Sequence, residues 1–168
     1  MSLALTRVSF PPAFSAIGDI VVSTGGNEAG GTAASTAKIL LVDDEDLLRR
    51  SMLRVLSRVL PLARENFLEA CNVASGIQVF DANQDLIRAV FTDMRMPDGF
   101  GLEVYDHVRR HSERTPVVFR SGGMPNDVRD ELNRILARDT RAKFYLKPDF
   151  PVHEIVSWLR GIWGGELT

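Results

Sequence analysis

The chain has 168 residues, of which 45% are hydrophobic and 25% are charged, and its formal net charge at pH 7 is -2. These values are typical of one globular domain with a buried core, and they give no basic excess of the kind that nucleic-acid binding requires. Cys71 is the only cysteine, so an internal disulfide and a zinc site built from several thiolates are both excluded, and we expect a reducing, cytoplasmic location.

Residues 1–37 differ in composition from the rest of the chain. They are rich in Gly, Ser, Thr and Ala, and we interpret them as a flexible leader or linker before a single domain that spans residues 38–168. No apolar run approaches the ~18 residues that a membrane-spanning helix needs. The first residues also lack the charged-then-apolar layout of a secretory signal. We therefore expect neither membrane insertion nor secretion.

Beyond residue 38, short apolar runs alternate with amphipathic helical patterns. Ile39–Val42 is a continuous apolar run, which is typical of a strand buried on both faces. Between residues 48 and 59 the apolar side chains recur at helical spacing, with arginines on the opposite side, and Pro61 ends that pattern. The first unit is therefore a strand followed by a helix.

Four more strand and helix units follow the first. The expected strands are residues 67–70, 86–92, 117–119 and 144–146, and the expected helices are residues 73–82, 102–108, 128–136 and 152–162. Strict alternation predicts an α/β fold, because parallel neighbouring strands need crossover connections and each connection here is a helix. We expect a five-stranded parallel sheet with helices on both faces.

Polar side chains stand where these strands end. Asp43 and Asp44 close the first run, Asp93 closes the third, Ser121 follows the fourth, and Lys147 follows the fifth. The carboxyl ends of parallel strands share one edge of the sheet, so we expect these side chains to meet in a single crevice. Three carboxylates, a hydroxyl and an ammonium group suit a hard cation and a phosphoryl group.

The chemistry of this group points to phosphoryl transfer. Asp93 is the predicted nucleophile, because a carboxylate is ionised near neutral pH and can attack phosphorus to form an acyl phosphate. Asp43 and Asp44 would repel an ionised Asp93 and raise the pKa of at least one of the three. A divalent cation removes that conflict, and a donor set of oxygens favours Mg²⁺. Lys147 would meet the phosphoryl oxygens as a point charge.

Two further acids follow the first pair. We expect Glu45 and Asp46 to cap the first helix, where negative charge suits the helix dipole.

Four segments, LVDDED, FTDMRMPDGFG, VVFRSGG and YLKPDF, stand at strand ends in this order. Together they resemble the receiver domain of response regulators in two-component signalling, over about residues 38–163. The resemblance implies a flavodoxin-like fold with strand order 2-1-3-4-5 and a phosphorylatable aspartate, at Asp93. The protein would then be a signalling phosphoacceptor that assists its own phosphorylation and dephosphorylation, and not an enzyme with a separate substrate.

The resemblance also implies roles for individual residues. It assigns ligation of Mg²⁺ to Asp43, Asp44, Asp93 and the backbone carbonyl of Arg95. It assigns phosphoryl binding to Lys147, to the hydroxyl of Ser121 and to the backbone of Met94 and Gly122. Lys147 would pair with the phosphoacceptor, and its bond to Pro148 would be cis. Phe144, three residues before Lys147, would be the switch aromatic whose rotamer couples to Ser121.

One departure from the family pattern lies just after the phosphoacceptor. Receivers often read MPxMDG there, whereas Phe100 replaces the usual acid in MPDGFG.

Implied partners are a histidine kinase or a histidine phosphotransfer protein. A downstream protein or a second copy of the chain would bind the surface formed by the fourth helix, the fifth strand and the fifth helix. Because the chain ends soon after that helix, we expect no direct contact with nucleic acid.

Three alternatives stay open. The chain could be the C-terminal receiver of a hybrid histidine kinase, with GDIVVSTGGNEAGGT as the end of the preceding region. It could be a scaffold receiver that is never phosphorylated. In a different class, it could be an aspartyl-phosphate-forming phosphatase of the haloacid-dehalogenase type. Such an enzyme needs a second aspartate two residues after the nucleophile, where this chain has Arg95, and this argues against general acid catalysis there.

Overall fold

The computed structural model describes residues 37–163, so nearly all of the predicted leader lies outside the described residues. The main strands are β1 (Lys38–Val42), β2 (Phe67–Ala70), β3 (Ile87–Asp93), β6 (Val117–Ser121) and β7 (Ala142–Leu146). The α-helices are α1 (Asp46–Val59), α2 (Val73–Asn83), α3 (Gly101–His111), α4 (Asn126–Arg138) and α5 (Val152–Trp163). A short 3₁₀ helix, η2 (Arg64–Asn66), precedes β2.

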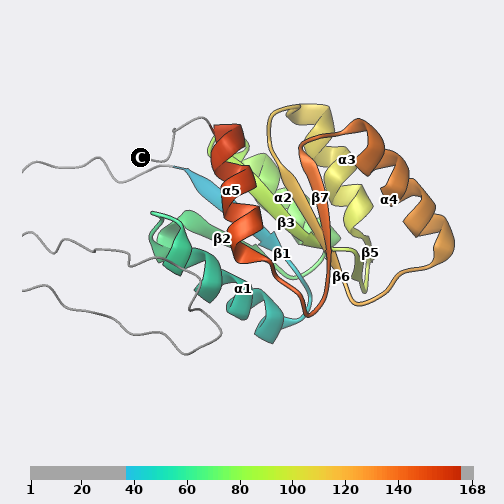
Figure 1. The fold of residues 1–168 in the computed structure, drawn as a ribbon, viewed down its shortest axis with the longest axis horizontal. Helices are drawn as coiled ribbons and strands as arrows, with labels where there is room; N and C mark the ends of the chain where they lie inside the picture. Colours follow the sequence, from blue (N-terminus) through green and yellow to red (C-terminus); the bar gives the residue numbers. More distant parts are fainter. Residues whose placement is uncertain (1–36, 164–168) are drawn as a thin grey trace, which may run out of the picture. The chain divides into compact units, whose positions relative to one another are not determined.

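The main strands form one parallel sheet in the order β2-β1-β3-β6-β7 (Figure 1). This is the predicted order, and each crossover is one of the predicted helices. Val42 pairs with Thr92, and Asp93 pairs with Arg120, so the carboxyl ends of the central strands lie side by side. The sheet therefore brings Asp43, Asp93 and the end of β6 to one edge.

Helices cover both faces of the sheet (Figure 1). On one face, α1 and α5 pack against strand residues that include Ile39 and Leu41. On the other face, α2, α3 and α4 pack against the alternate residues, such as Leu40 and Val42. All four of these β1 residues are fully buried. Burial on both faces explains why β1 reads as a continuous apolar run instead of alternating with polar residues.

The sequence patterns did not predict a small antiparallel pair beside the main sheet. It consists of β4 (Arg95–Met96) and β5 (Gly99–Phe100), joined by a turn at Pro97 and Asp98. Two-residue strands are too short to show a hydrophobic period, so only the turn residues mark them in the sequence.

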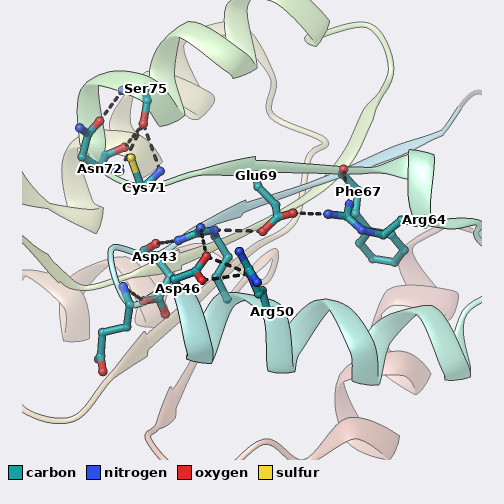
Figure 2. A network of polar contacts seen from close by, with 11 residues as sticks. Asp43, Asp46, Arg50, Arg64, Phe67, Glu69, Cys71, Asn72 and Ser75 are labelled. Atoms are coloured by element: carbon teal, nitrogen blue, oxygen red, sulfur yellow. Dashed lines mark hydrogen bonds and ion pairs between the residues drawn. The ribbon is translucent and has the colours of Figure 1, made fainter.

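Asp98 ties this turn to α2. Its carboxylate oxygens accept hydrogen bonds from the backbone N–H groups of Val73 (2.9 Å) and Ala74 (3.0 Å). The bond from Ala74, the larger cause, and that from Val73 lower the pKa of Asp98. The side chain of Asn72 accepts a further bond from Ser75 N–H (2.7 Å), which Figure 2 shows in its upper part. The start of α2 is thus capped both by its own N-cap residue and by the β4–β5 turn.

Within residues 37–163, none of the helices has the length and apolar character that a bilayer span demands.

Candidate functional site

The three predicted carboxylates meet at the carboxyl end of the sheet. One oxygen of each of Asp43, Asp44 and Asp93 lies within 4.8 Å of the others. Asp43 directly follows β1, and its N–H donates to the carbonyl of Ala70 (3.1 Å). Asp93 is the last residue of β3. Asp43 and Asp93 are buried, with exposed fractions of 1% and 6%, whereas Asp44 is exposed. The pocket therefore opens to solvent on the Asp44 side.

Lys147 brings its ammonium group into the same pocket. Its Nζ lies 2.9 Å from Asp93 Oδ2, 3.1 Å from Asp43 Oδ2 and 3.3 Å from Glu45 Oε1. The backbone N–H of Lys147 donates to the carbonyl of Ser121 (2.8 Å), which fixes the start of the loop after β7. The bond to Pro148 is cis, as the resemblance implied. Residues separated by about a hundred positions thus share one ion-pair network.

The surroundings of Lys147 favour its charged form. Burial acts to lower the pKa of Lys147, but the hydrogen bond to Asp93 and the charges of Asp43 and Asp93 outweigh it and raise the pKa overall. The ammonium group is therefore fully protonated at neutral pH.

The prediction that Glu45 caps α1 is only partly right. Glu45 is the N-cap residue of α1, but its side chain makes no capping hydrogen bond and reaches Lys147 instead. Asp46 lies in the first turn as expected, and its carboxylate accepts bonds from Arg49 (2.7 Å) and Arg50 (3.1 Å) (Figure 2). Arg49 also donates to the carbonyl of Asp43 (2.7 Å). The start of α1 is thereby fixed beside the pocket.

Asp43 is a buried carboxylate with an incomplete set of hydrogen bonds. Its Oδ1 accepts the N–H of Glu45 (2.9 Å). Its Oδ2 lies within ion-pair distance of Lys147, but without hydrogen-bond geometry, and has no hydrogen-bond partner among the described residues. Burial is the largest cause of the raised pKa of Asp43, Lys147 opposes it, and repulsion from Asp93 is the smallest of the contributions. The predicted direction is right, although burial and not mutual repulsion dominates. A buried carboxylate oxygen without a donor fits a cation site.

Asp43→Asn should therefore stabilise the protein in the absence of Mg²⁺. A carboxyl group whose pKa is raised by folding binds more protons in the folded state, so its contribution to stability falls as pH rises above 3.8 through the folded pKa. At pH 7 the ionised Asp43 is a net cost that asparagine removes. We expect the free energy of unfolding to rise by about 1 kcal/mol at pH 7, and by less at pH 4.

Urea unfolding without Mg²⁺ measures this effect. Asp44→Asn, at an exposed carboxylate, is the matched control and should change stability by less than about 0.5 kcal/mol. A loss of stability in Asp43→Asn at pH 7 would contradict the argument.

Gly101 supports the position of the phosphoacceptor backbone. Its N–H donates to the carbonyl of Met94 (3.1 Å). A Cβ at Gly101 would lie 2.3 Å from the backbone oxygen of Asp93 and 3.0 Å from Thr92 Oγ1. Only glycine therefore lets the start of α3 approach the end of β3 this closely.

Gly101→Ala should destabilise the protein by about 2 kcal/mol, because the backbone of β3 must move to accept the methyl group. Gly161→Ala in α5 is the matched control, since no atom lies within 4 Å of its added Cβ. That change should stabilise the protein by about 0.5 to 1 kcal/mol. Urea unfolding of both variants tests the pair, and equal effects would refute the close-approach argument.

Three of the predicted residues do not join the ion-pair network. The Ser121 hydroxyl donates to the carbonyl of Gly123 (2.7 Å) and accepts its N–H (3.1 Å). Phe144 is partly buried and packs against the core on the α4 side. The N–H of Met94 donates to the carbonyl of Arg120 (2.7 Å), so this group already has a partner.

Two further predicted positions are exposed residues. Gly122 is exposed, and a Cβ there would meet no atom within 4 Å. Arg95, whose carbonyl is the predicted fourth ligand, is exposed on β4.

Sequence reasoning missed Arg120, a second cation beneath the pocket. It is 5% exposed, and its guanidinium carbon lies 5.0 Å from the centre of the Phe150 ring. Its Nε has no hydrogen-bond partner among the described residues. Burial lowers the pKa of Arg120, whereas the charges of Asp43 and Asp93 oppose that shift. The signal in the sequence was an arginine inside the apolar run VVFRS, which indicates a buried charge but not the groups that surround it.

Comparison with known proteins gives an independent view of the same region. Residues 39–150 match the sequence profile of the response regulator receiver domain. The transcriptional regulatory protein SrrA of Staphylococcus aureus, from strains NCTC 8325 / PS 47 and COL, is 26% identical over 120 residues. The match includes 71% of this chain but only 44% of SrrA, so the chain spans less than half the length of these relatives.

Solved structures share the fold. A response regulator receiver domain protein from Clostridium thermocellum superposes with a TM-score of 0.61 at 24% identity, over 76% of this chain and 94% of that one. The receiver domain of the hybrid histidine kinase CckA gives a TM-score of 0.55 at 23% identity, over 75% and 98% of the two chains. At these identities the likeness concerns the fold alone.

Proposed function

The chain belongs to the family of response regulator receiver domains, and on this premise we propose that Asp93 accepts a phosphoryl group from a histidine kinase or a histidine phosphotransfer protein. The observation that carries the proposal is the contact of 2.9 Å between Lys147 Nζ and Asp93 Oδ2 inside the group of three carboxylates. A buried carboxylate with a fixed cation beside it suits attack on phosphorus.

The transfer needs little from the protein beyond position and charge. A carboxylate oxygen of Asp93 forms a bond to phosphorus while the bond from phosphorus to the donor's imidazole nitrogen breaks, and the donor leaves with the electron pair. Lys147 contacts Asp93, so its ammonium group would lie beside the phosphoryl oxygens and offset their charge.

The residues present fit Mg²⁺, which receiver domains bind in general. The side chains of Asp43, Asp44 and Asp93 and the carbonyl of Arg95 would hold it, and the Asp43 oxygen without a hydrogen-bond partner supports this assignment. When bound, the ion supplies positive charge that offsets the phosphoryl oxygens and the three carboxylates.

We propose that phosphorylation changes the surface of α4, β7 and α5. The hydroxyl of Ser121 would leave Gly123 to bind the phosphoryl group, and Gly122 would offer its backbone. The Met94 N–H would have to exchange its bond to Arg120 for one to the phosphoryl group. Phe144 on β7 would follow the movement of Ser121.

A downstream protein or a second copy of the chain would bind the surface of α4, β7 and α5. The proposed donors act in the cytoplasm, which we propose as the location. The receiver could stand alone or belong to a hybrid histidine kinase, as the likeness to the CckA receiver fold allows.

Fluoroberyllate, a mimic of the phosphoryl group, tests the function without a kinase. We expect saturable binding that requires Mg²⁺, seen as a protein-bound ¹⁹F signal and as shifts in the amide resonances of Ser121 and Phe144. Omission of Mg²⁺ should abolish the signal, and Asp46→Asn, a nearby acid outside the pocket, should leave it unchanged. Absence of binding with Mg²⁺ would favour the scaffold receiver instead.

A further inference from the structure

A second group of possible metal ligands lies between α2 and α3, which are neighbours on one face of the sheet (Figure 1). Asp81 on α2 and His107 and His111 on α3 each offer one ligand atom, and these atoms lie within 4.8 Å of one another. We propose that these three side chains bind a transition-metal ion, and that Zn²⁺ is the ion they suit.

The spacing of the histidines is that of a chelating pair. His107 and His111 are four residues apart on α3, so both rings lie on the same side of the helix. Their ring centres are 4.5 Å apart. The ring of Phe80 meets both of them edge-on, at 6.0 and 6.3 Å, and forms an apolar support behind the pair. The two imidazoles are therefore held together on one surface before any ion binds.

The hydrogen bond of His111 prepares it for a metal. Its Nδ1 lies 2.9 Å from the backbone carbonyl of His107, and because a carbonyl can only accept, Nδ1 must carry the proton. In the neutral ring this leaves Nε2 with a free lone pair. Metal-binding histidines typically donate their other nitrogen to such a carbonyl or carboxylate, which fixes tautomer and orientation.

Asp81 completes the group from the neighbouring helix. Its Oδ1 lies 2.6 Å from His107 Nε2, with a proton between the two atoms. Ligands of a tetrahedral Zn²⁺ ion stand about 3.4 Å apart, so this pair has to open by less than about 1 Å. The Asp81 side chain is 51% exposed and has room to move. When the ion binds, it displaces this proton from Nε2 of His107. If the ring is neutral, the proton moves to Nδ1. If the ring is charged, Nδ1 already carries a proton and the displaced one is released to solvent.

The donor types separate this site from the aspartate pocket. Two imidazole nitrogens and one carboxylate suit Zn²⁺ and its transition-metal neighbours, whereas a pocket of oxygens alone suits Mg²⁺. An ion held by residues of both helices would also tie α2 to α3, so it should stabilise the folded chain. The site does not depend on the proposed phosphoryl transfer.

Zinc titration of the full chain tests the proposal. The protein is purified without a polyhistidine tag, and the titration is done in excess Mg²⁺. We expect one Zn²⁺ per chain by calorimetry, with shifts in the imidazole resonances of His107 and His111. The chain has three histidines, so His153→Ala is the matched control and should bind zinc like the unchanged protein. His111→Gln and Asp81→Asn, both at exposed positions, should weaken binding by at least about tenfold, since loss of an outer partner alone costs that much.

Two results would overturn the proposal. One is a titration without saturable zinc binding. The other is binding that His111→Gln and Asp81→Asn leave unchanged, which would place the ion elsewhere, for example at the aspartate pocket. His107→Ala adds a third variant, and its circular dichroism spectrum shows whether the largely buried ring is also needed for the fold.

Discussion

Replacement of Asp93 by asparagine should abolish labelling of the protein by acetyl phosphate and Mg²⁺. The amide is a poor nucleophile. Among the described residues, Asp93 is the carboxylate that lies at the end of β3 and contacts Lys147. We expect a drop from up to one hydroxylamine-sensitive phosphoryl group per chain to none that can be detected. Intact-mass spectrometry before and after hydroxylamine treatment measures this directly, because an acyl phosphate is cleaved by that reagent.

Asp46→Asn is the matched control for this change. Asp46 is an exposed acid at the start of α1, where it pairs with Arg49 and Arg50 instead of Lys147. This variant should be labelled as the unchanged protein is. An equal, labile label on Asp93→Asn would show that another residue accepts the phosphoryl group, and the proposed function would then fail.

Replacement of Lys147 by methionine should slow phosphorylation by about 10² to 10³, the range seen when one fixed group that stabilises transition-state charge is lost. The ammonium group faces Asp43, Glu45 and Asp93 within 3.3 Å. Without it, the two buried carboxylates lose their common counter-charge, so the protein should also lose stability at neutral pH. The initial rate of labelling at saturating Mg²⁺ and the urea midpoint are the two measurements.

Lys143→Met is the control for Lys147, because Lys143 lies on β7, the strand that leads to Lys147, and its ammonium group contacts Glu154 (3.9 Å) and the Trp158 ring and takes no part in the described ion pairs of the aspartate pocket. It should leave the rate unchanged. Lys147→Arg separates charge from fit, since it keeps the charge but replaces a compact ammonium with a planar fork. A normal rate in a folded Lys147→Met protein would remove Lys147 from the proposed mechanism.

The aspartate pocket shows how a candidate functional site can reduce the stability of the fold. Asp43 is buried with one oxygen that lacks a hydrogen-bond donor, and Arg120 is buried with an Nε that lacks an acceptor among the described residues. Each of these unpaired atoms is a net cost to the folded domain. The two charges have opposite sign and attract one another across the pocket, which limits the cost.

The sequence by itself determined the fold class, the strand order through the resemblance, and the residues Asp43, Asp44, Asp93 and Lys147 that meet in one pocket. Hydrophobic period is a local property, so alternating strand and helix patterns could be recognised without coordinates. Topology then brings all strand ends to one edge, which explains why side chains from separate strand ends could be grouped correctly.

Only the tertiary structure decided the contacts that depend on where neighbouring elements pack. It showed that Glu45 reaches Lys147 instead of capping α1, that Arg120 lies beneath the pocket, and that Asp98 caps α2. It also showed that burial outweighs mutual repulsion in raising the pKa of Asp43. Side-chain direction, depth of burial and contacts between helices are set by packing across the whole domain, and no local pattern along the chain records them.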